Sequence, residues 1–487
     1  MTKLRKIILI PALVIVFISG FFSCGVDRWP EYAHQTALDT WLLDIMQQNY
    51  LWYQDLPSYD DANLFLAPDQ FLSKVKSKND SYSFVDSIME TPLPSYGFDY
   101  SLVRNPDIDT AYNALITYVI PGSPAATAGL KRGNWIVKVD TSYISKKYET
   151  LLLQGTKPLE VTLGTYQKVD PEEPPAEGEE PEDIYRVVPE EEPTEIGAAV
   201  PLIDNPVHCM KILPYKDGEV GYLMYNSFTA GTKDDAEKYN NELRNWSAEL
   251  AQKDIHKVIL DLRYNKGGSI DCAQLLSTML APSFYLDQTM AFIEYNDKNT
   301  AKDATLTFNS ELLTPSGKNL DLTTLIVLIS GETAGAPEML MHCLNGKIQE
   351  LIAIGSSTKG QNVATEQFVN EEFLWSINPV VCTIYNSEHD TYTGYKPTYA
   401  VNASTDYLTF LPFGDEKETL LSVALGVLNK TYPPKEDEDT GETKKAQLKI
   451  EKSVSSPASR RFTSNGLRLL QITTFKRKHI NPLLNSL

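Results

Sequence analysis

The sequence predicts an α/β core with a mainly parallel sheet in the second half of the chain. Residues 258–262 and 325–329 are short apolar runs, broken only by Asp261, and such runs are typical of strands buried on both faces. Amphipathic segments lie between the strand signals, and the clearest covers residues 233–252. Its apolar residues fall on one side of a helix: Ala236, Tyr239, Leu243, Trp246 and Leu250. Because strands alternate with helices here, we expect helices to cover a parallel sheet.

The amino terminus has the pattern of an exported bacterial lipoprotein. Basic residues at positions 3, 5 and 6 precede the apolar stretch 7–22, as in a secretory signal. The stretch ends in Ser23 and Cys24, and a small residue before a Cys at this point resembles a lipobox. We therefore expect residues 1–23 to be removed and Cys24 to carry a lipid. The lipid would anchor the protein in the cell envelope, at the periplasm-facing outer membrane. An uncleaved transmembrane helix is the alternative, for which the stretch is short.

Residues 24–92 are expected to form a mainly helical segment. Apolar residues recur at helical spacing in its first part: Leu38, Trp41, Leu42, Ile45, Met46 and Tyr50. Pro57 interrupts this pattern, and Pro68 stands where a second helix is expected to begin.

Residues 93–206 are expected to form a β-rich domain that binds peptides. Residues 119–140 read V-I-P-G-S-P-A-A-T-A-G-L-K-R-G-N-W-I-V-K-V-D, which resembles the strand, short helix and returning strand of a PDZ domain. Tyr96, Gly97 and Phe98 match the loop whose backbone amides hold a peptide's terminal carboxylate in that family. The resemblance implies that the C-terminus of a protein or peptide binds there and adds a strand to a sheet edge.

Charge and composition predict two disordered segments and argue against one class of partner. The formal net charge is −20, and phosphates repel such a surface, so we expect no nucleic-acid partner. Residues 170–195 are rich in Pro and Glu and cannot bury apolar surface, so we expect a disordered insertion over about residues 168–198. Residues 432–487 turn acidic and then basic, and we expect a disordered tail there.

Three motifs within residues 207–431 carry the functional prediction. Residues 260–268 read L-D-L-R-Y-N-K-G-G, residues 325–338 read L-I-V-L-I-S-G-E-T-A-G-A-P-E, and residues 352–365 read I-A-I-G-S-S-T-K-G-Q-N-V-A-T. In this order and spacing they resemble the core of the tail-specific, or C-terminal processing, serine peptidases. The resemblance implies a crotonase-like α/β core, joined to the PDZ-like domain and the helical segment. It also implies a protein that acts on polypeptide C-termini.

The two positions that decide the chemistry of that family hold unsuitable residues in this chain. The family nucleophile is a Ser, where this chain has Gly335, and the family base is a Lys, where it has Gln361. Glycine has no side chain to attack a peptide bond, and an amide has no useful basicity near neutral pH. Glu338 matches a family Glu, and the resemblance implies an oxyanion hole made by the amides of Gly268 and Ala336. We therefore predict a pseudoenzyme with lost or strongly reduced hydrolysis.

Two alternatives stay open on the sequence. A displaced catalytic pair would use Thr333 or Ser330 as nucleophile and Lys359 as base. The protein would then be an active serine endopeptidase that processes protein C-termini. The other alternative is a carrier of small apolar ligands, because the same core fold serves that purpose in other proteins.

The cysteines indicate no metal site. No Cys and His spacing resembles a set of metal ligands, and the sequence implies no cofactor. In an oxidising compartment, four cysteines beyond the lipobox allow three disulfide pairings, with buried free thiols as the alternative. These four are Cys209, Cys272, Cys343 and Cys382.

Overall fold

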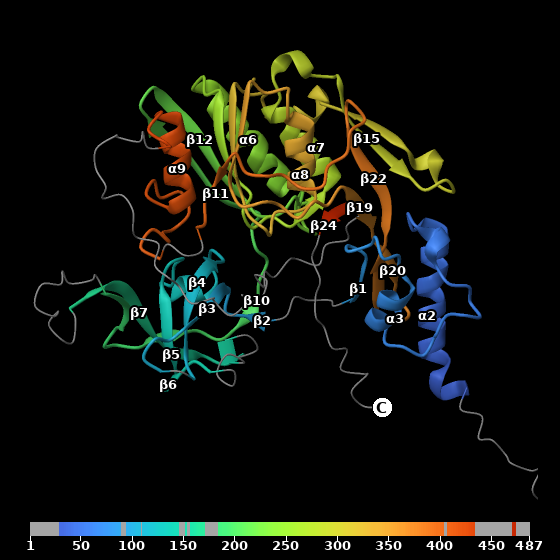
Figure 1. Ribbon diagram of the computed structural model, residues 1–487, viewed down its shortest axis with the longest axis horizontal. Helices are drawn as coiled ribbons and strands as arrows, with labels where there is room; N and C mark the ends of the chain where they lie inside the picture. Colours follow the sequence, from blue (N-terminus) through green and yellow to red (C-terminus); the bar gives the residue numbers. More distant parts are fainter. Residues whose placement is uncertain are drawn as a thin grey trace, which may run out of the picture.

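The computed structural model of the chain (Figure 1) describes eight stretches: residues 29–88, 94–108, 110–145, 151–152, 156–170, 184–403, 407–433 and 470–473. Side chains are described from residue 36 onward, except in residues 470–473. The predicted signal sequence and lipid site at Cys24 lie outside the described residues. Within these stretches, no helix has the length and apolar character needed to cross a membrane.

A six-stranded sheet forms the centre of the core, and it confirms the predicted α/β class. Its strands run in the order β11 (Val207–Tyr215), β12 (Gly218–Tyr225), β13 (Lys257–Asp261), β17 (Thr324–Ile329), β18 (Glu350–Gly355) and β23 (Tyr399–Ala400). β11 is antiparallel to β12, and every other neighbouring pair is parallel. The carboxyl ends of β13, β17 and β18 therefore meet at one edge of the sheet.

Helices cover both faces of this sheet, and the strand pattern explains why. α6 (Lys238–Gln252), α7 (Ile270–Leu280) and α8 (Ala336–Leu344) pack on one face, and α9 (Thr419–Leu428) packs on the other (Figure 1). In β17, alternate residues face the two sides, so Val327 contacts the three-helix side and Ile326 the side of α9. α6 begins five residues later than predicted, and Ala236 is exposed before its first turn.

A second sheet, antiparallel in every pairing, lies beside the first and contains a strand from the carboxyl-terminal region. Its order is β14 (Gly267–Ser269), β24 (Leu470–Thr473), β19 (Val363–Glu366), β22 (Val380–Asn386), β15 (Thr289–Tyr295) and β16 (Ala304–Thr307). The prediction of a wholly disordered tail over residues 432–487 is therefore wrong for β24. The reason is that β24 has partners on both sides, which a composition argument cannot detect.

The N-terminal segment is helical and is attached to the core by a strand. α2 (Trp29–Asn49) and α3 (Pro68–Val75) bury their apolar residues against the ends of β21 (Trp375–Asn378) and β22. β1 (Phe84–Ser87) then pairs with β21, which also pairs with β20 (Phe368–Asn370). The segment is thus part of the core's edge.

The predicted β-rich domain lies below the core in Figure 1. Its main strands are β3 (Phe98–Arg104), β4 (Tyr112–Val119), β5 (Trp135–Val139), β7 (Leu159–Val169) and β8 (Ile184–Pro189), with the short helix α4 (Pro124–Thr127) between β4 and β5. β8 and β9 (Thr194–Ile196) fall inside the segment predicted to be disordered, so that prediction is wrong for them. β8 pairs antiparallel with β7, and the ring of Tyr185 in β8 stacks on that of Tyr166 in β7 with the ring centres 5.8 Å apart.

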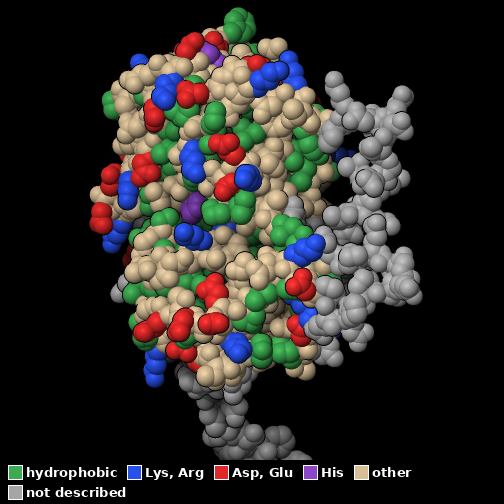
Figure 2. Space-filling model, turned by 90° about the vertical axis from the view of Figure 1, so that its left-hand side faces the viewer, with side chains coloured by type: hydrophobic (Ala, Val, Ile, Leu, Met, Phe, Trp, Pro, Cys, Tyr) green, Lys and Arg blue, Asp and Glu red, His purple; other side chains and the backbone are tan. Residues whose placement is uncertain are grey.

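Two further features are the state of the four described cysteines and the charges on one face of the molecule. Cys209, Cys272, Cys343 and Cys382 are free thiols, which is the alternative to disulfides that the sequence left open. On the face shown in Figure 2, basic and acidic side chains are interspersed.

Candidate active site

Gly335 lies on the sharp turn between β17 and α8. β17 is buried along its whole length, and Pro337 stands in the first turn of α8, where its missing N–H is not needed. Gly335 has φ 71° and ψ −114°, a backbone conformation that residues with side chains rarely adopt. A strained strand-to-helix turn of this kind exposes the nucleophile in many hydrolases. Gly335, the predicted nucleophile position, therefore lies on a turn of this strained type, although it has no side chain.

The carboxylate of Glu338 joins this turn to the loop that carries Gln361. Oε2 of Glu338 accepts the amide of Gly335 at 2.9 Å and the amide of Gln361 at 2.8 Å. Oε1 accepts the amide of Gly360 at 2.6 Å and the hydroxyl of Thr358. Because Gly335 and Gln361 bond to the same oxygen atom, the two positions lie side by side. Burial raises the pKa of Glu338, and the four donors oppose that rise.

Gln361 is fully buried and its side chain has a structural partner. Its Nε2 donates to the backbone carbonyl of Val363 at 3.1 Å, and the backbone carbonyl of Gln361 accepts a hydrogen bond from the hydroxyl of Tyr392 at 2.8 Å. The side chain is therefore held inside the loop, and it can neither take nor give a proton near neutral pH. Gln361, which the sequence predicts at the base position, thus bonds within its own loop.

The glycine pair after β13, Gly267 and Gly268, forms the wall of the candidate site opposite the turn at Gly335. The amide of Gly267 donates to Asn265 Oδ1 at 2.9 Å, and Gly268 lies against Phe228 with φ 138°. A Cβ at Gly268 would approach the carbonyl oxygen of Phe228 to 2.2 Å, so only glycine fits there. The carbonyl of Asn265 accepts the amide of Ala334 at 3.1 Å, two residues before Ala336. The structure thus holds the two predicted oxyanion residues on adjoining segments.

The residues of a displaced catalytic pair are placed differently. Thr333 is buried, and its hydroxyl donates to the carbonyl of Leu262 at 2.9 Å. The hydroxyl of Ser330 donates to the carbonyl of Arg263. Lys359 is exposed, and its backbone amide, not its side chain, bonds to Thr333. Both hydroxyl protons therefore bond to the backbone, which leaves neither hydroxyl paired with a base.

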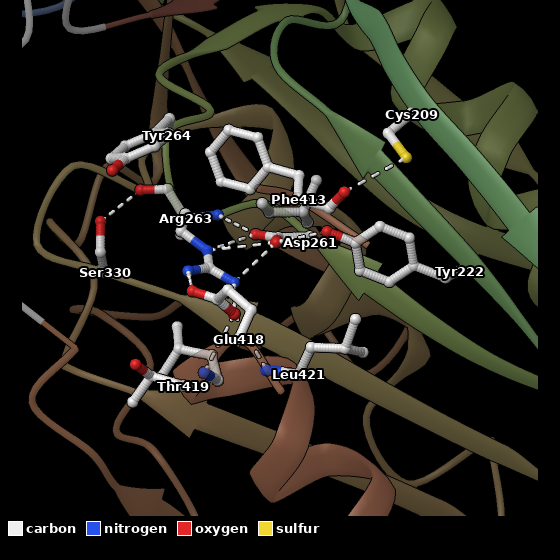
Figure 3. Close-up of polar contacts among 12 residues, drawn as sticks. Cys209, Tyr222, Asp261, Arg263, Tyr264, Ser330, Phe413, Glu418, Thr419 and Leu421 are labelled. Carbon is white, nitrogen blue, oxygen red and sulfur yellow. Dashed lines mark hydrogen bonds and ion pairs between the residues drawn. The ribbon is translucent and has the colours of Figure 1, made fainter. Parts of the chain in front are cut away.

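A buried ionic cluster lies between the carboxyl end of β13 and the start of α9 (Figure 3). Arg263, two residues after the end of β13, binds Asp261 at 2.8 Å and also binds both oxygens of Glu418 at the start of α9. Asp261 also accepts the hydroxyl of Tyr222 at 2.9 Å. Burial opposes ionisation of Glu418, but Arg263, Arg132 and the amide of Leu421 together outweigh it and lower the pKa of Glu418 to about 2. The cluster was not predicted, although Asp261 was the single break in an apolar strand.

Arg132 extends this cluster into the β-rich domain. Its guanidinium donates to the carbonyl of Leu411 at 3.0 Å and to the hydroxyl of Tyr264 at 2.9 Å, and it lies 3.4 Å from Glu418. Its charged carbon stands 3.5 Å from the centre of the Phe410 ring. The β-rich domain is therefore fixed to the core by a buried cation, close to the strand ends that carry the site.

A cavity of about 620 Å³ lies at this junction. Its wall includes Arg132, Arg263 and the hydroxyl residues Ser330, Ser356 and Ser357, together with apolar residues from the ends of β17 and β18. The wall is thus mixed in character and not purely apolar.

Tyr96, Gly97 and Phe98 lie at the start of β3, within the β-rich domain and apart from the glycine turn. All three are buried, and Gly97 has φ 85°, as a tight loop requires. The hydroxyl of Ser95 accepts the amide of Gly97 at 2.9 Å. One of the amides predicted to bind a peptide carboxylate is therefore already engaged by a neighbouring side chain.

Metal chemistry has no candidate ligand set in the described stretches. Nowhere in them do three or more His, Cys, Asp or Glu side chains come together so as to hold a metal ion.

Two family models match the chain. The model of peptidase family S41 matches residues 219–396, and the model of the peptidase S41 N-terminal domain matches residues 37–84. The first match contains the glycine pair, the turn at Gly335 and the loop of Gln361.

Known proteins with similar sequences or structures are also proteases of this kind. A crystal structure of a protein assigned to the S41 proteases of Bacteroides fragilis NCTC 9343 is 44% identical, covers 80% of this chain and 97% of its own, and gives a TM-score of 0.74. A carboxyl-terminal-processing protease of Picosynechococcus sp. is 25% identical over 268 residues. That match covers 54% of this chain and 54% of the relative, so the chain spans about half of the relative's length. A CtpA-like serine protease of Staphylococcus saprophyticus is 22% identical over 377 residues, 76% of this chain and 67% of that protein.

Proposed function

The chain belongs to peptidase family S41, and from this premise we propose that it binds polypeptide C-termini without cutting them. In this proposal it is a membrane-anchored pseudopeptidase that retains the frame of the site. The main observation behind the proposal is that the backbone amides of Gly335 and Gln361 donate to the same oxygen atom of Glu338. This closeness supports the proposal that they occupy the positions of a nucleophile and its base, and neither side chain can do that chemistry.

The loop of the β-rich domain supports the proposed capture of C-termini. Backbone amides in a tight glycine loop are suitable donors for a carboxylate, and Gly97 sits in such a loop. Bound peptide would add a strand to the edge of the sheet at β3, which has β4 on one side only among the described strands.

The proposed anchor is a lipid on Cys24. The support is the order of charged, apolar and Ser-Cys residues at the amino terminus. Labelling of cells with an alkyne fatty acid should mark the wild-type protein and leave Cys24→Ser unmarked. Equal labelling of both proteins would overturn the anchor.

Hydrolysis of an unfolded protein tests the proposed loss of activity. Wild-type protein incubated with casein should release peptides no faster than buffer. Gly335→Ser alone should also be inactive, because its hydroxyl lacks a base. The double variant Gly335→Ser/Gln361→Lys should recover measurable cleavage if burial keeps the new amine neutral.

Two matched variants separate chemistry from folding. Gly335→Ala imposes the same backbone strain as Gly335→Ser without a hydroxyl, and Gln361→Met has nearly the length of Lys without its amine. Cleavage by wild type that both variants leave unchanged would show that another pair of residues does the chemistry. The pseudopeptidase proposal would then be wrong.

The two alternative functions receive less support from the geometry. A displaced pair needs a base beside Thr333 or Ser330, but both hydroxyls donate to backbone carbonyls and Lys359 is exposed. A carrier of small apolar ligands needs an apolar cavity, but the cavity at the domain junction is lined by Arg132 and Arg263.

A further inference from the structure

A strand from the carboxyl-terminal region fills the space between two walls of the candidate site. β24 pairs antiparallel with β14 through Gly268 and with β19 through Thr365. Among the described strands, β14 has no other strand partner, and on its far side its backbone pairs only through the single bridge between Gly268 and Phe228. Without β24, the two edges would therefore enclose an empty strand position.

The hydrogen bonds around Gly268 fix which way this position faces. The carbonyl of Gly267 accepts the amide of Phe228 at 3.0 Å, and the amide of Ser269 donates to the carbonyl of Phe228 at 2.7 Å. Groups of alternate residues in a strand point to opposite sides, so the amide of Gly268 is left on the side of β24. Gly268 is paired with Ile472 across this interface.

The filled position also runs past the two substituted catalytic positions. α8, whose first residue follows Gly335, lies against both β14 and β24. On the other side, β19 begins two residues after Gln361. A strand in this place therefore passes between the glycine pair, the turn at Gly335 and the loop of Gln361.

Charge supports the identity of the occupant. Residues 452–487 contain seven Lys or Arg residues and no Asp or Glu, whereas the chain as a whole has 44 Lys or Arg and 64 Asp or Glu. Residues 1–451 therefore carry a formal charge of −27 against +7 in the tail. Opposite charge favours the return of this tail to its own acidic body, and Ile472 and Thr473 are β-branched residues suited to a strand.

We propose that Leu470–Thr473 is a built-in occupant of the strand position between β14 and β19. Any extended polypeptide that enters the candidate site must first displace it. The tail would thus keep the site closed until a competing peptide is present. This inference depends on the backbone of the site and is independent of whether hydrolysis has been lost.

Hydrogen exchange on the full-length chain tests the proposal. Ile472→Pro removes a strand N–H and restricts the backbone, whereas Ile472→Val keeps both and preserves β-branching. Exchange measured by mass spectrometry should be at least about tenfold faster at β14 and β19 in Ile472→Pro than in wild type, as expected for lost strand bonds. Ile472→Val should match wild type, and β17 should be unchanged in both.

A peptide added in trans gives a second readout. A fluorescein-labelled, C-terminally amidated peptide with the sequence of residues 466–476 should bind Ile472→Pro at least about tenfold more tightly than wild type, because its site is vacant. The amide removes the carboxylate that the loop at Gly97 would recognise, so failure here does not bear on the proposed capture of C-termini. Equal exchange at β14 and β19, with equal peptide binding in all three proteins, would overturn the proposal.

Discussion

Glu338 and Glu418 are both almost fully buried at 1% exposure, and both hold loops at the carboxyl edge of the core sheet, yet their surroundings are opposite. Glu338 is surrounded by neutral donors, namely three backbone amides and one hydroxyl. Glu418 faces the guanidinium groups of Arg263 and Arg132. Burial raises the pKa of Glu338, whereas the nearby cations lower the pKa of Glu418 to about 2 despite its burial.

This difference implies that Glu338 shapes the candidate site, whereas Glu418 stabilises the fold around it. The cluster of Glu418 joins three distant parts of the chain through charges that compensate one another. The cluster of Glu338 has no cation and shapes only the turn at Gly335 and the loop of Gln361. A substitution at Glu418 should therefore destabilise the whole molecule, whereas one at Glu338 should mainly loosen the site.

The largest expected effect comes from Arg263→Met. The change leaves the carboxylates of Asp261 and Glu418 buried without their main cation, which should lower the free energy of unfolding by about 3–5 kcal/mol. Urea unfolding followed by tryptophan fluorescence measures this loss. Lys266→Met is the matched control, because Lys266 pairs with the partly exposed Glu332 and should cost less than about 1 kcal/mol. Equal losses for the two variants would contradict the structural role of the cluster.

A smaller effect is expected for Glu338→Gln. The amide keeps one acceptor oxygen but places an NH₂ group where backbone donors point, so the free energy of unfolding should fall by about 1–3 kcal/mol. Hydrogen exchange should increase at Gly335 and at Thr358–Gln361 while β17 stays protected. An increase spread evenly over the core would show that Glu338 supports the whole fold and not only the site.

The contributions of Glu338 and Glu418 to stability should change with pH in opposite directions. Glu338 has a raised pKa in the folded state, so its contribution to stability is present below the unfolded value of about 4.5 and is lost as pH rises through the folded pKa. Glu418 has a lowered pKa, so its contribution is present above about pH 4.5 and is lost as pH falls toward 2. Thermal unfolding of wild type, Glu338→Gln and Glu418→Gln across pH 2–7 should show these opposite trends. Parallel trends would contradict the comparison.

The smallest expected effect concerns peptide capture. Ser95→Ala frees the amide of Gly97 from its present acceptor, so a peptide with a free C-terminus should bind roughly two- to tenfold more tightly, the worth of about one hydrogen bond. Fluorescence titration measures this change, with the C-terminally amidated peptide as control. A gain that is equal for the acid and the amide would exclude carboxylate binding at this loop.

The sequence was sufficient where local pattern determines structure. The apolar run before Gly335 and the Pro337 after it predict a strand, a turn and a helix, and the structure places β17 and α8 there. The glycine pair needs a close backbone approach, which a Gly-Gly sequence already suggests. These features depend on residues that are neighbours in the chain, so their motifs carry the information.

The sequence was insufficient where distant residues meet. Arg132 and Glu418 are 286 residues apart, and nothing in either neighbourhood indicates the other. Asp261 in an apolar strand was the only signal that a buried charge needed a partner. The pairings of β24 and β8 were likewise missed, because composition describes a segment alone and not the sheet edge that receives it.

Covalent labelling tests the central claim, that the frame of a serine peptidase here lacks its catalytic groups. A fluorophosphonate probe reacts with an activated hydroxyl, and peptide mass mapping then identifies the labelled residue. The wild-type protein should carry no label at any Ser or Thr of the site, and Gly335→Ser/Gln361→Lys should be labelled at position 335. A label on Thr333 or Ser330 of the wild-type protein would contradict the claim and identify an active, displaced nucleophile.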